Sequence, residues 1–92
     1  MLKDIVFVEA LEGYRLKIRF EDGVEGIIDV SEITPFTGVF APLKDKSVFD
    51  KVRLNSELGS IEWESGADLD PDVLYANITG QAITEYSQNA NM

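Results

Sequence analysis

The sequence predicts an α+β domain: an antiparallel sheet of about five strands in hairpins, with one or two short helices packed on one face. Three features lead to this prediction. Residues 14–20 alternate strictly between apolar and basic side chains, which is typical of a strand with one buried face. Asp22 and Gly23 follow, and this pair favours a tight hairpin turn because glycine takes positive φ without steric cost. Pro71 opens a later run with the apolar spacing of a helix.

The chain has 92 residues, enough for one domain with a thin core. We expect residues 1–80 to form a single α+β domain and residues 81–92 to form a polar C-terminal tail. Hydrophobic residues make up 45% of the chain, an ordinary share for a globular protein. The N-terminus enters a strand-like pattern at once, and no apolar run approaches the ~20 residues that span a bilayer. We therefore expect a cytoplasmic protein with no membrane partner.

The first expected hairpin occupies the N-terminal third of the chain. Its β-branched and aromatic residues predict a strand over residues 3–9, and Gly13 lies in the turn that follows. The second strand has one apolar face for a core and one basic face. The returning strand covers residues 24–30, and its acidic residues are expected to pair with the basic face across the hairpin. The apolar face consists of Tyr14, Leu16, Ile18 and Phe20, and the basic face of Arg15, Lys17 and Arg19.

The middle of the chain predicts short helical pieces between helix-breaking residues. Ser31 is expected to begin a helical turn that Pro35 soon ends. An apolar cluster around a second proline follows. Asp45 or Ser47 is then expected to cap a short helix over residues 48–51, because both side chains can accept a hydrogen bond from a free backbone N–H.

A second hairpin is expected over residues 52–64, with its turn at residues 55–59. Trp63 shares one face of the second strand with an isoleucine, whereas Glu62 and Glu64 share the other face. A lone tryptophan at such a position is predicted to anchor the core, because it buries a large apolar area. A platform for a ligand is the alternative interpretation of this tryptophan.

The segment after this hairpin predicts a turn and then a helix. Gly66 marks the turn, and Asp68 or Asp70 is expected to accept hydrogen bonds from the free N–H groups of the helix. Pro71 suits the first helical position, since its missing N–H would have had no partner there. The helix is expected to pack Leu74 on the sheet and to end at the next glycine.

The net charge of −9 is distributed unevenly. Residues 1–53 contain ten acidic and eight basic residues, whereas residues 54–92 contain seven acidic residues and no lysine or arginine. Binding of nucleic acid by the second half is disfavoured, because phosphates need basic side chains. We expect a basic protein partner instead, with a solvated acidic face that favours solubility as the alternative. The candidate interaction surface consists of Glu62, Glu64, Asp68, Asp70 and Asp72.

The residue types restrict catalysis. The chain has no cysteine and no histidine, so thiolate chemistry and the usual general base are both missing. We expect no catalytic residue, no cofactor and no metal. Asp68, Asp70 and Asp72 alternate as in a calcium loop, but the glycine and the bidentate glutamate of such loops are absent. An alternative function is a small ligand- or metal-binding domain, or an enzyme, that uses Glu62, Glu64 and Asp68.

Two parts of the chain carry a family resemblance. Residues 14–30, with Asp22-Gly23 at the turn, and residues 49–75, with Trp63, Gly66, Asp68, Pro71, Leu74 and Tyr75, form its structural motif. Together they resemble the bacterial domain of unknown function 2442. The resemblance implies a small α+β domain with no established activity. Such domains are often encoded beside another small protein, in arrangements that look like toxin–antitoxin pairs. Members fused to a DNA-binding domain exist, and that role is not carried over.

Three functional hypotheses follow. The first is a non-catalytic protein-interaction module, the antitoxin-like member of a two-gene pair, whose acidic surface binds a basic protein encoded nearby. The second is the ligand- or metal-binding domain or enzyme built on the acidic cluster. The third is a structural domain that associates with itself as a homodimer, because sheet edges are natural pairing surfaces.

Overall fold

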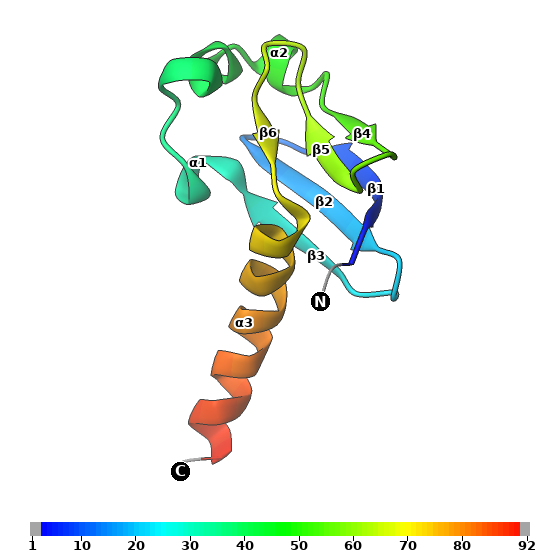
Figure 1. Ribbon diagram of the computed structural model, residues 1–92. Helices are drawn as coiled ribbons and strands as arrows, with labels where there is room; N and C mark the ends of the chain where they lie inside the picture. Colours follow the sequence, from blue (N-terminus) through cyan, green and yellow to red (C-terminus); the bar gives the residue numbers. More distant parts are fainter. Residues whose placement is uncertain (1–2, 91–92) are drawn as a thin grey trace.

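The computed structural model describes the backbone of residues 3–90 and the side chains of residues 3–80. It confirms the α+β class and the antiparallel hairpins, with six strands in two three-stranded sheets of order β1-β2-β3 and β4-β5-β6 (Figure 1). The elements in chain order are β1 Ile5–Ala10, β2 Arg15–Phe20, β3 Glu25–Asp29, α1 Val30–Ile33, the 3₁₀ helix η1 Gly38–Lys44, α2 Lys46–Phe49, β4 Arg53–Asn55, β5 Ser60–Glu62, β6 Asp68–Leu69 and α3 Pro71–Ala90.

The first sheet follows its predicted pattern of faces. Leu16, Ile18 and Phe20 of β2 are buried, and Arg15 and Arg19 are exposed on the opposite face. The turn to β3 lies at Asp22 and Gly23. Gly23 has φ +91°, and the Val24 N–H donates to the Asp22 carboxylate at 3.0 Å. On the outer face, Lys17 and Glu25 form the expected cross-strand ion pair at 3.7 Å.

The short helices begin at aspartates. Asp29 caps α1 by accepting a hydrogen bond from the Ser31 N–H at 2.9 Å, and Asp45 caps α2 by accepting one from the Ser47 N–H at 3.0 Å. Helix α1 therefore begins at Val30, one residue before Ser31. Of the two predicted caps of the next helix, Asp45 is the one used, and α2 begins two residues before the expected start. The apolar cluster between them forms the 3₁₀ helix η1, with Pro42 inside it. The sequence did not indicate this helix, because a proline inside a segment argues against a helix there.

The second sheet is built from much shorter strands. β5 ends at Glu62, two residues earlier than predicted, because the chain turns at Gly66 and returns as β6. β6 contains only Asp68 and Leu69, too few residues to show a periodic pattern in sequence. The Trp63 N–H donates to the Ala67 carbonyl at 2.9 Å and closes this hairpin.

The core lies between the two sheets, and one tryptophan connects its parts. Trp63 is only 2% exposed, and its indole N–H donates to the Phe49 carbonyl at 2.9 Å. The Phe49 and Trp63 rings lie 5.8 Å apart, and Tyr14 packs edge-on against Phe49 at 5.3 Å. The sheets meet where the Ile5 N–H donates to the Gly59 carbonyl at 2.8 Å. Trp63 thus has the anchoring position that its alternation predicted.

Helix α3 begins at Pro71, as predicted, and buries Leu74. Gly26 of β3 lets it approach closely, because a Cβ on Gly26 would lie 2.8 Å from an Ile78 methyl group. The expected end at Gly80 is wrong: the backbone stays helical to Ala90. The polarity expected of the tail over residues 81–92 concerns side chains outside the described residues. No described helix is long and apolar enough to cross a membrane.

Candidate functional site

The five predicted interaction residues follow one another along the second sheet and into α3. Four of them are exposed, and Glu62 is partly buried. The register of the sheet places Glu62 directly opposite Asp68 on one side and Arg53 on the other. Their positions are β5 for Glu62, the following turn for Glu64, β6 for Asp68, the junction before α3 for Asp70 and the first turn of α3 for Asp72.

Glu62 is held by neighbours on β4. Its carboxylate accepts hydrogen bonds from the Asn55 amide at 3.0 Å and from the Arg53 guanidinium at 2.9 Å. These two contacts, the Asn55 bond first, lower the pKa of Glu62 below its ordinary value. A carboxylate that is ionised and already paired is poorly suited to act as a general acid or base near neutral pH. The ion pair also means that Glu62 is not one of the uncompensated acids.

Asp68, Asp70 and Asp72 come together around one shallow depression. Its volume is about 350 Å³. Leu58 also lines it and exposes 65% of its surface, so the acids share the depression with an exposed apolar side chain. We call this feature the acidic depression; it is lined by Leu58, Ser60, Asp68, Leu69, Asp70, Pro71 and Asp72.

Asp70 has a structural task within the acidic depression. Its side chain accepts a hydrogen bond from the Asp72 N–H at 2.8 Å, and its carbonyl accepts one from the Leu74 N–H at 3.2 Å. Of the two capping candidates, the helix therefore uses Asp70, while Asp68 belongs to β6. The carboxylates of Asp68 and Asp72 thus have no capping role at the start of α3.

Glu64 lies apart from the residues that line the acidic depression. It sits in the turn between β5 and β6, where Gly66 has φ +100°. The neighbouring Ser65 hydroxyl donates to the Val39 carbonyl at 3.2 Å and ties the turn to η1. Within the described side chains, no three acidic groups are arranged to hold a metal ion, and Glu62, Glu64 and Asp68 form no such group.

The two halves of the sequence motif meet between the first sheet and α3. The Tyr75 hydroxyl donates to the Asp22 carboxylate at 2.6 Å. This bond lowers the pKa of Asp22 and raises that of Tyr75. The Tyr75 ring also packs edge-on against Phe20, with centroids 4.9 Å apart. Asp22 and Tyr75 therefore hold the first hairpin against the helix, which is a structural role.

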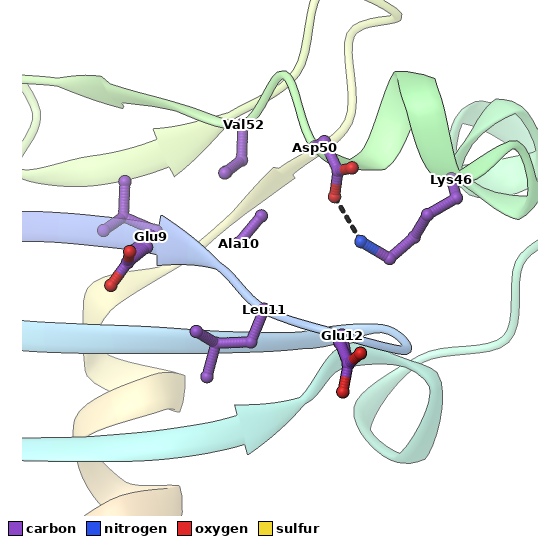
Figure 2. A pocket seen from close by; sticks show the side chains of 8 residues that line it. Glu9, Ala10, Leu11, Glu12, Lys46, Asp50 and Val52 are labelled. Carbon is purple, nitrogen blue, oxygen red and sulfur yellow. Dashed lines mark hydrogen bonds and ion pairs between the residues drawn. The ribbon is translucent and has the colours of Figure 1, made fainter.

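A second hollow, which the sequence did not indicate, lies between β1 and the α2–β4 segment (Figure 2). Its volume is about 710 Å³. Three apolar and two acidic residues line its β1 side. We call it the β1 groove; it is lined by Val8, Glu9, Ala10, Leu11, Glu12, Lys46, Asp50 and Val52. The sequence could not predict this groove, because it depends on the spacing in the fold between β1 and a segment far from it in the sequence.

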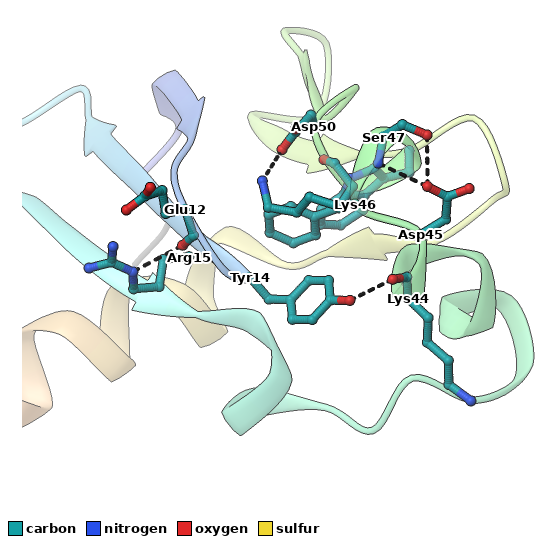
Figure 3. A network of polar contacts seen from close by, with 10 residues as sticks. Glu12, Tyr14, Arg15, Lys44, Asp45, Lys46, Ser47 and Asp50 are labelled. Carbon is teal, nitrogen blue, oxygen red and sulfur yellow. Dashed lines mark hydrogen bonds and ion pairs between the residues drawn. The ribbon is translucent and has the colours of Figure 1, made fainter.

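Polar contacts hold the wall of the β1 groove in place (Figure 3). The Tyr14 hydroxyl donates to the Lys44 carbonyl at 2.5 Å and joins the first sheet to the end of η1. The Asp45 cap fixes the start of α2. Lys46 forms an ion pair with Asp50, the residue that follows α2. The only ammonium group among the lining residues is therefore already paired.

Comparison with known proteins identifies one family. A family model described as "Protein of unknown function (DUF2442)" matches residues 5–80. The match begins with β1, includes both sheets and ends within α3. Comparison with curated proteins and with solved structures finds no match.

Proposed function

The chain belongs to the DUF2442 family of proteins of unknown function, and we propose that it is a non-catalytic protein-interaction module. In this proposal the acidic depression receives a basic surface of a protein partner. The observation that carries the proposal is that Asp68 and Asp72 line one depression together with the exposed Leu58. No basic residue follows Arg53 in the sequence, so the chain offers these acids no partner from its own second half.

The physical chemistry of the acidic depression favours such a partner. Carboxylates around an apolar residue attract a basic protein and speed its approach, while the apolar contact slows its release. Leu58 supplies the contact that a purely solvated acidic face would lack. The proposed setting is the bacterial cytoplasm, with the chain as the antitoxin-like member of a two-gene pair. Its partner would then be a small basic protein encoded next to it.

Co-expression with the products of the two adjacent genes tests this proposal. We expect one of them to copurify with the chain at low salt and to dissociate as the salt concentration rises, because exposed charges are screened. The variant Asp68→Asn/Asp72→Asn removes two charges and keeps the Asp70 cap, so it should fold and lose the partner. The control Glu25→Gln/Glu32→Gln removes two charges near the other sheet and should keep it. Absence of any association at micromolar concentration would reject the proposal.

A further inference from the structure

We propose that the outer edge of β1 binds an extended, basic segment of a partner protein, which adds to the first sheet as a further strand. This inference goes beyond the proposed function, because the β1 groove and the acidic depression share no lining residue. Strand addition to an exposed sheet edge is a recurrent mode of peptide recognition, in which backbone hydrogen bonds provide the affinity.

The hydrogen-bond pattern shows which backbone groups face the groove. The Leu11 N–H donates to the Arg15 carbonyl at 2.8 Å, so the backbone N–H of Leu11 points toward β2. Residues of an antiparallel strand alternate between facing the neighbouring strand and facing away from it. Because Val8 pairs with Ile18 and Ala10 with Leu16, the N–H and C=O groups of Val8 and Ala10 point away from β2. These four groups form the outer edge.

The second sheet lies near β1 but forms no backbone hydrogen bond with this part of the edge among the described residues. Within the described residues, the hydrogen bond from Ile5 to Gly59 is the only backbone bond between β1 and the second sheet. A β-bulge between Ile5 and Phe7 then turns β1, and the groove opens between Ala10 and Val52. Figure 2 shows Val52 above Ala10 with the hollow extending toward Lys46 and Asp50. An added strand next to β1 would therefore enter this hollow.

The side chains indicate the chemistry of the occupant. Glu9 and Glu12 are exposed, and neither takes part in an ion pair among the described residues. Lys46 is engaged by Asp50. Val8, Ala10 and Val52 provide an apolar floor. Successive side chains of a strand point to opposite faces of a sheet. An added strand with alternating apolar and basic side chains could therefore place apolar side chains on one face and basic side chains on the other.

A second copy of this chain fits the edge less well. Pairing β1 with another β1 would bring the acidic residues Glu9 and Glu12 of two copies into the same sheet edge. Like charges directly opposite in a sheet are destabilising, and each chain carries a net charge of −9. The charges therefore favour a basic partner over a homodimer.

The test uses two synthetic peptides, one of alternating lysine and valine and one of alternating glutamate and valine, with both ends blocked. We expect the lysine peptide to bind at least about tenfold more tightly, because like charges repel the other peptide. In the bound state, hydrogen exchange of the Val8 and Ala10 amides should slow by at least about tenfold, as expected of newly formed hydrogen bonds. Equal affinity for both peptides, or unchanged exchange at these two amides, overturns the proposal.

Two variants locate the binding site. Ala10→Pro removes an N–H that faces the groove and keeps every β1–β2 hydrogen bond, so it should abolish binding while Ala10→Ser keeps it. Glu9→Lys/Glu12→Lys should reverse the preference and favour the glutamate peptide, which tests the edge even where the proline variant fails to fold. Asp68→Asn/Asp72→Asn should bind the lysine peptide normally, because that variant changes the acidic depression only. Protection of Val8 and Ala10 together with a doubled mass, in the absence of peptide, would overturn the assignment in favour of a second copy.

Discussion

The two sheets of this protein differ in length and in how their charges are balanced. The first sheet has strands of five or six residues, and its basic stripe on β2 faces acidic residues on β3. The second sheet has strands of two or three residues, and its last strand supplies Asp68 to the acidic depression, next to Asp70 and Asp72 at the start of α3. The first sheet therefore pairs its basic stripe with acidic residues, whereas Asp68 of the second sheet is exposed and forms no ion pair among the described residues.

Because their strands differ in length, the two sheets are also stabilised in different ways. Long strands hold the first sheet together through their own ladder of hydrogen bonds. The second sheet is too short for that and depends on a few specific contacts: the buried Trp63, the close approach at Gly59 and the Arg53–Glu62 pair. Substitutions at these three places should therefore have distinct and ordered effects.

The largest effect is expected at Trp63. Replacing it with alanine leaves a cavity between the sheets and removes the indole hydrogen bond to the Phe49 carbonyl, and should lower the free energy of unfolding by about 3 to 5 kcal/mol. Trp63→Phe keeps part of the packing and should cost less. Urea denaturation of both variants measures the difference. Equal stability of Trp63→Ala and the wild-type protein would show that the second sheet does not depend on this residue.

A smaller effect is expected at Gly59, where the sheets meet. Its φ is +67°, and a Cβ there would overlap the Asp4 carboxyl group. Gly59→Ala should cost about 1 to 3 kcal/mol from the backbone conformation, with an additional loss from the overlap. Gly13→Ala is the matched control, since φ there is +68° and no atom lies within 4 Å of the added Cβ. In thermal unfolding, Gly59→Ala should have a lower melting temperature than Gly13→Ala. The reverse order would contradict the close packing of Gly59 against Asp4.

Glu62 should make stability depend on pH. Its folded-state pKa lies below the ordinary value of 4.5, so its contribution is present above that pH and is lost as the pH falls through the folded-state pKa. Glu62→Gln should therefore reduce the melting temperature at pH 7 and have less effect near pH 3. Glu25→Gln, which removes an exposed ion pair of the first sheet, should change stability less. If Glu62→Gln lowered the melting temperature as much at pH 3 as at pH 7, the pairing of Glu62 with Arg53 and Asn55 would be contradicted.

The smallest effect is expected for Tyr75→Phe. It removes the bond to Asp22 and keeps the ring against Phe20. Because that bond lowers the pKa of Asp22, the variant should bring this pKa closer to its ordinary value of 3.8. NMR titration of the Asp22 carboxyl carbon measures it. An unchanged pKa would show that Tyr75 does not contact Asp22 in solution.

Sequence patterns predicted the first sheet better than the second. The strict alternation over residues 14–20 specified which residues of β2 are buried, and Asp22-Gly23 located the turn. β6 was not predicted, because a strand of two residues is too short to show an alternating pattern in the sequence. The end of α3 was misplaced because a single glycine is tolerated inside a helix. Local signals therefore predict local structure well only where an element is long enough to repeat.

The candidate surface was predicted in part. The acidic run indicated Asp68, Asp70 and Asp72, and the structure places these three around one depression. Sequence alone could not show that Arg53 pairs with Glu62, because the register of β4 and β5 decides this contact. An exposed leucine between a glutamate and a glycine was a signal for Leu58 that the sequence interpretation overlooked. The β1 groove had no local signal, since it depends on long-range packing.

The central claim is that the carboxylates of the acidic depression bind a basic partner. Its most direct test is the dissociation constant for the adjacently encoded basic protein, measured at about 50 and about 500 mM salt. Binding to the wild-type protein and to Glu25→Gln/Glu32→Gln should weaken with salt to the same degree. Asp68→Asn/Asp72→Asn should bind at least about tenfold more weakly at low salt and respond less to added salt. Equal affinity and equal salt dependence for all three proteins would contradict the claim.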